Sequence, residues 1–251
     1  MYNGTTIEKF INTIKSAVKY GKTNGYDISN EIDDKNFTYK REETYDTYLN
    51  EAEIDKIFKL KLADDKALSI ARDWLIIGVW TGLRVSDLKR LDKMNIDMER
   101  MVLTNITTQK TNQKIELPIH HQIQEVLRKR NGELPPKISE QHFNDKIKQV
   151  CAKADIDQKI RGKKKIGTKL PNGEKTYRKK LDYYPKHQLI SSHTCRRSFA
   201  TNHYGKIPNR TIMAMTGHKS EAQFEKYLKQ SQAEHIETLK NYWMNQNNKN
   251  D

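Results

Sequence analysis

The opening of the chain carries apolar side chains at helical spacing. They recur every three or four residues, at Phe10, Ile11, Ile14 and Val18. Thr5 precedes them with Glu8 three residues later, which is the spacing of a capping box, and Gly25 is typical of a helix end. The pattern predicts one amphipathic helix. Such a helix cannot bury its apolar face alone, so it must pack on another element or belong to a larger domain.

A second helical stretch follows a polar, charged segment. Residues 26–46 have no clear period and are predicted to be a linker. Asn50, with Glu53 three residues on, predicts a new helix start, and apolar residues follow at Ile54, Ile57, Phe58 and Leu60. Residues 64–80 predict a longer helix whose end is almost wholly apolar, which indicates a place in the core. The Thr-Gly pair at 81–82 is predicted to end it.

The middle of the chain changes to a period of two. Residues 101–108 and 114–119 alternate between apolar and polar side chains, which predicts two strands joined by a polar turn at 111–113. Helices are predicted to resume near residues 121–130 and again over 139–154.

The last third of the chain combines a basic segment with further helices. Residues 160–187 are rich in Lys, Arg, Gly and Tyr, and they predict an extended loop or a second hairpin that turns at 171–173. Residues 191–243 are predicted to be helical, with breaks at 205–208 and at Gly217. The whole pattern predicts a mixed α/β, mostly helical fold with a small β-hairpin sheet.

Charge points to a polyanionic partner. The chain has 46 Lys and Arg against 32 Asp and Glu, a net charge of +14 and a pI near 9.5. Nucleic acid is the natural partner for such a balance, although a soluble basic surface gives the same count. No apolar run approaches the ~20 residues that cross a bilayer, and the polar opening lacks the apolar core of a signal peptide, so no membrane partner is expected. Cys151 and Cys195 have neither metal-ligand nor disulfide-framework spacing, which favours a reducing cytoplasm.

The candidate chemistry lies near the end of the chain. His193 and Arg196 are three residues apart, so on a helix both side chains share one face. Such a pair can hold a phosphate, because the guanidinium binds two oxygens and the imidazole donates to another or moves a proton. Tyr227 follows and is a candidate covalent nucleophile, although a lone tyrosine is more often a packing residue. The combination suggests DNA strand transfer.

Four segments in order resemble the motifs of the tyrosine recombinases, the phage integrase family. Residues 81–88 resemble its first-arginine motif, and residues 108–119 resemble the hairpin that carries a catalytic lysine. Residues 193–201 resemble the HxxR helix, and residues 215–227 resemble the closing segment with Gly-His and the tyrosine. The likeness extends from residue 47 to about residue 243. The lysine- and tyrosine-rich insertion before His193 resembles that of integrases from mobile elements of the Bacteroides group.

The resemblance implies a set of six catalytic residues: Arg84, Lys110, His193, Arg196, His218 and Tyr227. Tyr227 would attack the scissile phosphate to give a 3′-phosphotyrosine and a free 5′ hydroxyl, while the two arginines compensate the charge on the phosphate oxygens. The histidines would act in acid-base and hydrogen-bond roles, and Lys110 would protonate the departing 5′ oxygen, with Lys114 as its rival. Neither metal, ATP nor another cofactor is expected.

The resemblance also implies DNA contacts and an assembly. The residues expected to contact double-stranded DNA are basic: Lys163, Lys164, Lys165, Lys175, Arg178, Lys179, Lys180 and Arg197. Arg197 could equally form a salt bridge. Strand exchange implies self-association, as a tetramer on paired DNA sites, with a possible accessory DNA-bending factor. A helix around Ile236, Leu239, Tyr242 and Trp243 would contact a neighbouring subunit or pack on its own domain.

Three segments are expected along the chain. Residues 1–46 are a remnant of a helical core-binding domain with a linker, residues 47–243 are the catalytic domain, and residues 244–251 are a disordered tail. The short N-terminal segment departs from the family and suggests a truncated integrase. The protein is expected to act on nucleoid DNA in the cytoplasm. Two alternatives remain: a type IB topoisomerase, with the same chemistry without site pairing, and a DNA-binding module without catalysis.

Overall fold

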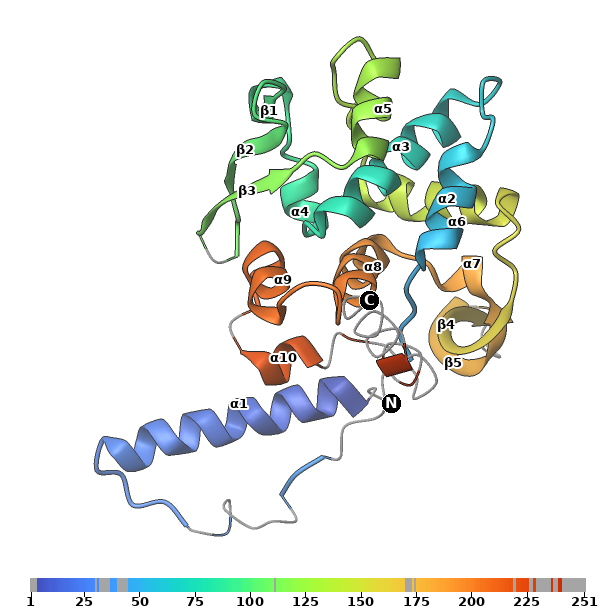
Figure 1. Ribbon diagram of the computed structural model, residues 1–251. Helices are drawn as coiled ribbons and strands as arrows, with labels where there is room; N and C mark the ends of the chain where they lie inside the picture. The colour runs from blue at the N-terminus through green and yellow to red at the C-terminus, as the bar shows by residue number, and fades with distance from the viewer. Residues whose placement is uncertain are drawn as a thin grey trace. The chain divides into compact units, whose positions relative to one another are not determined.

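The computed structural model divides the chain into two compact units, Met1–Tyr45 and Asp46–Asp251 (Figure 1). It describes residues 4–29, 31, 37–39, 45–110, 112–169, 173, 175–218, 220–225, 228, 236 and 239–240. The first unit contains one long helix, α1 (Gly4–Thr23), which confirms the amphipathic helix predicted at the front of the chain. Its apolar side chains at Phe10 and Ile14 are about half exposed.

The second unit is built around the apolar helix α3 (Lys66–Thr81). Asp65 caps its start by accepting from the amide of Leu68. Four other helices pack on α3, namely α2 (Glu51–Lys59), α5 (His121–Lys129), α6 (Glu140–Lys153) and α8 (Ser192–His203). The core contains Leu75, Ile76 and Ile77 from α3, together with buried residues of the four surrounding helices. The predicted capping box at the start of α2 is present, because Asn50 and Glu53 exchange hydrogen bonds of 2.8 and 2.9 Å.

A three-stranded antiparallel sheet lies beside this helical core. It has the order β1 (Ile96–Asp97), β2 (Val102–Thr107) and β3 (Lys114–Pro118), after the short 3-10 helix η2 (Lys93–Asn95). Leu103 and Leu117 pair across β2 and β3 and are buried, so the apolar face of the alternating pattern faces the core. The predicted hairpin is confirmed; of its turn residues, Thr111 lies outside the described residues.

The basic segment forms the second hairpin that the sequence offered as one of two possibilities. β4 (Lys159–Lys169) and β5 (Lys175–Pro185) pair in one continuous register, from Lys159 opposite Pro185 to Lys169 opposite Lys175. Pro171 and Asn172, predicted in the turn, lie outside the described residues. The hairpin leads into the short helix α7 (Lys186–Leu189).

The closing helices carry a small second core. They are α8 (Ser192–His203), α9 (Asn209–Thr216) and α10 (Glu221–Glu225), with breaks near the predicted positions. Phe199, Ala200, Ile212 and Phe224 form this core, and Met215 packs against both it and the main core. In Figure 1, α8 and α9 lie below α4 (Val85–Leu88).

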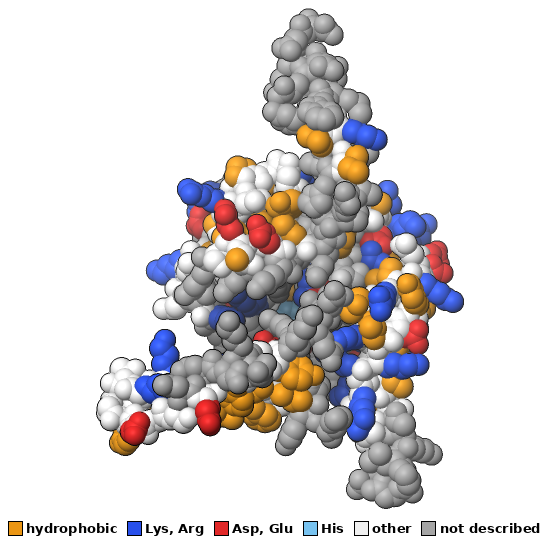
Figure 2. Space-filling model, turned by 90° about the horizontal axis from the view of Figure 1, so that it is seen from below, with side chains coloured by type: hydrophobic (Ala, Val, Ile, Leu, Met, Phe, Trp, Pro, Cys, Tyr) orange, Lys and Arg blue, Asp and Glu red, His pale blue; other side chains and the backbone are white. Residues whose placement is uncertain are grey.

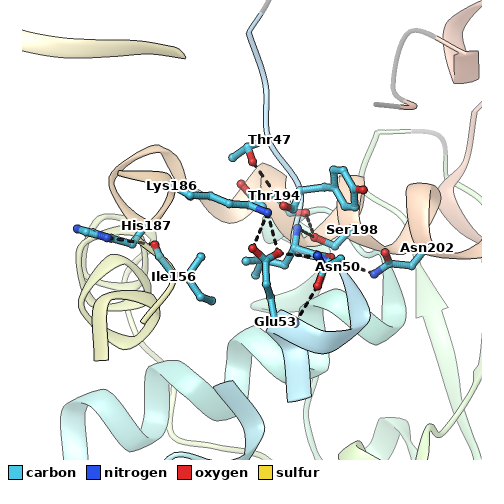
Figure 3. A network of polar contacts seen from close by, with 11 residues as sticks. Thr47, Asn50, Glu53, Ile156, Lys186, His187, Thr194, Ser198 and Asn202 are labelled. Carbon is cyan, nitrogen blue, oxygen red and sulfur yellow. Dashed lines mark hydrogen bonds and ion pairs between the residues drawn. The ribbon is translucent and has the colours of Figure 1, made fainter. Parts of the chain in front are cut away.

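Long-range polar contacts tie the start of the second unit to α7 and α8 (Figure 3). Ser198 accepts a hydrogen bond from the amide of Leu49 at 2.8 Å, and the amide group of Asn202 donates to the carbonyl of Leu49 at 3.0 Å. Lys186 donates to both carboxylate oxygens of Glu53 at 2.7 Å. Within the described part of the chain, no helix is both long and apolar enough to span a membrane.

Candidate active site

Arg84 is placed by the sharp end of α3. Gly82 ends that helix in the left-handed region with φ of 63°, a conformation that costs other residues ~1–2 kcal/mol. A Cβ at position 82 would lie 2.7 Å from the ring of Phe199, so the site also needs the absence of a side chain. Two residues later Arg84 is the N-cap of α4, with a half-buried side chain and no capping hydrogen bond from it. The turn therefore places Arg84 between α3 and α4.

Arg196 reaches the same turn from α8. Its side chain is buried, with only 4% of the residue exposed, and its Nη1 donates to the carbonyl of Gly82 at 3.0 Å. α8 can approach α3 closely because Gly78 leaves room for Cys195, whose Sγ would lie 3.0 Å from a Cβ there. Arg196 is thus bonded to the backbone two residues before Arg84, although the two arginines lie far apart in the sequence.

His193 lies one helical turn before Arg196 and is exposed. The predicted pair therefore lies on one helix with unequal burial: the arginine is inside and the histidine is at the surface. The imidazole of His193 is therefore accessible to a substrate and to water.

His218 completes the group at the end of α9. Gly217 ends α9 in the left-handed region with φ of 60°, and His218 follows directly. Burial, and after it the positive charges of Arg196 and Arg84, lower the pKa of His218 from 6.5 to about 4. The ring is therefore neutral at pH 7. The positive charges of Arg196 and Arg84 thus act on His218, although the three residues come from three separate elements.

Thr216 decides which ring nitrogen of His218 carries the proton. Its hydroxyl lies 2.6 Å from the carbonyl of Ile212 and 2.7 Å from Nδ1 of His218. The single hydroxyl proton goes to the Ile212 carbonyl, which can only accept, so the oxygen of Thr216 accepts from Nδ1–H. The neutral ring then has Nε2 as its acceptor nitrogen.

Lys110 lies in the turn between β2 and β3 and is exposed. The carboxylate of Asp87, on α4, anchors this turn: Oδ1 accepts from the amide of Gln109 at 2.9 Å and from Nη2 of Arg90 at 2.8 Å. Asp87 is 2% exposed, so the contact is buried. The turn that carries Lys110 is therefore fixed to the helix whose N-cap is Arg84. Lys114 is also exposed, at the start of β3.

Tyr227 lies outside the described residues. Phe224, three residues before it, is fully buried, and its ring centroid lies 5.6 Å from that of His218. α10, which contains Phe224, is therefore packed next to His218.

The predicted DNA-contact residues divide into two groups. Arg197 forms an ion pair with Asp46 at 2.7 Å, with its side chain 15% exposed. The other residues lie on the β4–β5 hairpin, where Lys165, Lys175, Arg178, Lys179 and Lys180 are exposed while Lys163 and Lys164 are half-buried.

Two site residues were missed in the sequence, Asp87 and Thr216. Both lie inside segments that carried the resemblance, three residues after Arg84 and two before His218. Their roles depend on which residues they contact in the folded chain, and the sequence does not identify those contacts. Among the described residues, no three His, Cys, Asp or Glu side chains are placed to hold a metal ion.

The sequence matches the phage integrase family over residues 47–234. Among solved structures, a lambda integrase dimer bound to a COC' core site is 16% identical, with a TM-score of 0.61 over 90% of this chain and 74% of that chain. The Tn1549 transposon integrase in complex with transposon right end DNA is 12% identical, with a TM-score of 0.61 over 96% of this chain and 79% of that one. XerA recombinase is 14% identical, with a TM-score of 0.51 over 98% and 76%. At these identities the likeness concerns the fold. Comparison with curated proteins gives no match.

Proposed function

The chain belongs to the phage integrase family and is a site-specific tyrosine recombinase, and we propose that Tyr227 is the nucleophile that it uses on DNA. Residues 47–243 would form the catalytic domain. Arg84, Lys110, His193, Arg196 and His218 would act with Tyr227 on one phosphodiester. The observation that carries this proposal is the convergence of Arg84, Arg196 and His218 at the turn that ends α3.

The arginines would stabilise the charge that develops on the phosphate. A phosphodiester in transfer carries its charge on the non-bridging oxygens, and two held guanidinium groups compensate it without reorganisation. Arg196 is already oriented by its bond to the Gly82 carbonyl, so its remaining donors are directed by the fold rather than by the substrate. The site needs no cofactor to supply positive charge.

Proton transfer would be divided among the other groups. Tyr227 must lose its phenolic proton as it attacks the phosphorus, and the imidazole of His193, which is exposed, would take it. The leaving 5′ oxygen must gain a proton, which Lys110 would donate from the anchored turn. The products are a 3′-phosphotyrosine and a free 5′ hydroxyl. Attack by a 5′ hydroxyl reverses the step, so the bond energy is conserved and ATP is not consumed.

We propose double-stranded DNA as the partner and self-association on paired sites as the working state. The net charge of +14 supports the first part. The second is supported by the lambda integrase structures, one a dimer bound to a core site and another a tetramer bound to a Holliday junction. A mobile element of the Bacteroides group belongs to the same proposal, on the basis of the lysine- and tyrosine-rich insertion, and so does an accessory DNA-bending factor. The enzyme would then act on nucleoid DNA in the cytoplasm.

The test is a suicide substrate, a nicked duplex whose short 5′-hydroxyl strand diffuses away after cleavage. Loss of that strand removes the nucleophile for rejoining, so the covalent protein–DNA adduct accumulates and resists denaturant. Tyr227→Phe keeps the ring and removes the attacking oxygen, so it should abolish the adduct and leave duplex binding unchanged. Arg196→Ala should suppress the adduct by ~10²-fold or more.

The control is the position of the adduct. Peptide mapping should place it at Tyr227, and an adduct in Tyr227→Phe that maps to Tyr204 or Tyr242 would show that another tyrosine is the nucleophile. Relaxation of a supercoiled plasmid without recombination of two paired sites would favour the topoisomerase alternative. Binding without any adduct would favour the module without catalysis.

A further inference from the structure

The two faces of the β4–β5 hairpin differ in what they contact. Successive side chains of a strand point to opposite faces, and directly opposed residues share a face. In this register Lys165 opposes Lys179 and Lys164 opposes Lys180. Odd-numbered residues of both strands therefore share one face, here called the odd face, and even-numbered residues share the other, the even face.

The even face packs on the domain. Gly162 is buried, and a Cβ there would collide with the side chain of Leu189 on α7. Lys164 donates to the side chain of Gln188 at 2.7 Å, and its ammonium lies 5.7 Å from the ring centroid of Tyr184. Opposite Lys164 and Gly162 on the other strand, Lys180 forms an ion pair with Asp182 at 3.3 Å. The base of this face therefore contacts the domain, whereas Arg178 and Lys180 farther along it are exposed.

The odd face has basic side chains along its length, all of them exposed except the half-buried Lys163. Its basic residues are Lys159, Arg161, Lys163, Lys165, Lys175 and Lys179, and none of its described residues is acidic. Tyr177 and Tyr183 lie between them and are 57% and 65% exposed. The ring of Tyr177 covers Gly167, with the ammonium of Lys165 5.1 Å from its centroid. Figure 2 shows Lys and Arg side chains with hydrophobic side chains between them at the lower right, where the hairpin lies.

The base of the hairpin is fixed to the domain that carries Arg196. The amides of Lys186 and His187 donate to the carbonyls of Gln158 and Ile156 at 2.9 and 3.0 Å. Lys186 also binds Glu53 on α2, so the junction between the hairpin and α7 is held from two sides (Figure 3). Because α8 follows α7 directly, the orientation of the odd face is coupled to that of the catalytic helix.

We propose that the odd face of the β4–β5 hairpin is a second contact surface for duplex DNA. The hairpin lies along a groove of the DNA, beside the cleavage site. This inference rests on the proposed function, which supplies the DNA. Eleven residues at about 3.3 Å each extend about 36 Å, close to one turn of B-DNA, and the major groove admits a two-stranded ribbon. Lysine and tyrosine side chains both donate to phosphate oxygens, which position a protein without reading sequence.

The experiment compares two triple variants with the same change in charge. The odd-face variant is Lys165→Gln, Lys175→Gln and Lys179→Gln, and the even-face variant is Lys164→Gln, Arg178→Gln and Lys180→Gln. Fluorescence anisotropy of a labelled duplex measures affinity across a salt series. The odd-face variant should lower the slope of log affinity against log salt by ~2–3, because each lost phosphate contact removes ~0.9. The even-face variant should change the slope by less than ~1, a result that would remove Lys164, Arg178 and Lys180 from the residues expected to contact DNA.

Two further measurements keep the outcomes separate. The unfolding midpoints of both triple variants show whether the protein remains folded. A double variant, Tyr177→Ala with Tyr183→Ala, tests the odd face without changing its charge. This double variant should weaken duplex binding at least ~5-fold, about 1 kcal/mol. Equal slopes in the two folded triple variants would overturn the inference. If the wild-type chain forms no Tyr227 adduct while the odd-face variant still loses slope, the proposed function fails and the hairpin surface stands. If the adduct forms and the slopes are equal, the reverse holds.

Discussion

The proton on His218 is controlled by one hydroxyl group. Thr216 donates to the Ile212 carbonyl and accepts from Nδ1–H of the ring, so Nε2 has the lone pair. The same hydroxyl oxygen also stabilises the protonated ring, because an imidazolium has two N–H groups and each needs an acceptor. Burial and the two arginines oppose that charge. The state of His218 is therefore a balance between its nearest hydrogen bond and its electrostatic surroundings.

Thr216→Val should change how cleavage depends on pH. The substitution keeps the shape but removes the acceptor for Nδ1–H, which lowers the pKa of His218 further, so the acid limb of the cleavage rate should move to lower pH. Thr216→Ser keeps the oxygen and should follow the wild-type profile. The measurement is the single-turnover rate of adduct formation across pH on the suicide substrate. A profile for Thr216→Val that is parallel to wild type and only lower would assign Thr216 a packing role alone.

The same pKa has a consequence for stability. The pKa of His218 is about 4 in the folded chain and near 6.5 when unfolded, so below pH 6.5 the unfolded chain binds the proton first. The contribution of the neutral ring to stability is therefore complete above about pH 6.5 and is lost as pH falls toward 4. A bound phosphate would offset the arginine charges and raise the pKa of His218.

At the scale of elements, a short helix and a hairpin turn act as one unit. Asp87 on α4 binds Gln109 in the turn and also Arg90, whose Nη2 donates to the Thr107 carbonyl at 2.5 Å. The buried carboxylate thus fixes where the turn begins. Lys110 is the next residue along, so its reach toward the phosphate depends on a residue of α4.

Asp87→Ala should slow cleavage through Lys110. Loss of the anchor displaces the turn, and a misplacement of about 1 Å can cost ~10²-fold in rate, while duplex binding should be kept. Asp87→Asn retains an acceptor oxygen for the Gln109 amide and should recover most of the rate. Adduct formation is measured on a normal substrate and on one whose leaving 5′ oxygen is replaced by sulfur.

The sulfur substrate separates positioning from general damage. A thiolate leaves without a proton, so it should restore the rate of Asp87→Ala and of Lys110→Ala but not that of Arg196→Ala. Lys114→Ala should behave as wild type on both substrates. Rescue of Lys114→Ala in place of Lys110→Ala would move the general acid to the rival lysine.

At the scale of the whole catalytic unit, a buried ion pair joins α2 to α7. Lys186 and Glu53 form an ion pair whose side chains are only 9% and 15% exposed. On the same helix, Glu51 pairs with Lys206 at the same distance of 2.7 Å, but those side chains are 52% and 59% exposed. The two pairs differ mainly in burial, which makes them a matched comparison.

Lys186→Met should destabilise the chain far more than Lys206→Met. Removing one member of a buried pair leaves the other charge without compensation, which costs ~3 kcal/mol or more, whereas an exposed pair contributes less than ~1 kcal/mol. Urea unfolding at equilibrium measures both. Similar losses in the two variants would mean that water reaches Glu53 in solution and that the junction between α2 and α7 is held by its backbone bonds.

Local interactions made much of this protein predictable from its sequence. The capping box of Asn50 and Glu53, the end of α3 at Gly82 and the alternation in β2 and β3 all depend on partners a few residues away or on one residue's own backbone freedom. The same local motifs carried the resemblance to the phage integrase family, which the match over residues 47–234 confirms. Which residues could form the site was therefore visible in the chain itself.

Only the tertiary structure decided how those residues meet. The bond from Arg196 to Gly82 spans 114 positions, and the one from Gln109 to Asp87 spans 22. Whether a lysine of the hairpin faces DNA or the domain depends on strand register and on where α7 packs, which composition does not specify. The physical reason is that burial and long-range contacts arise only when distant segments close around a common core, so exposure, proton position and anchoring are properties of the folded chain.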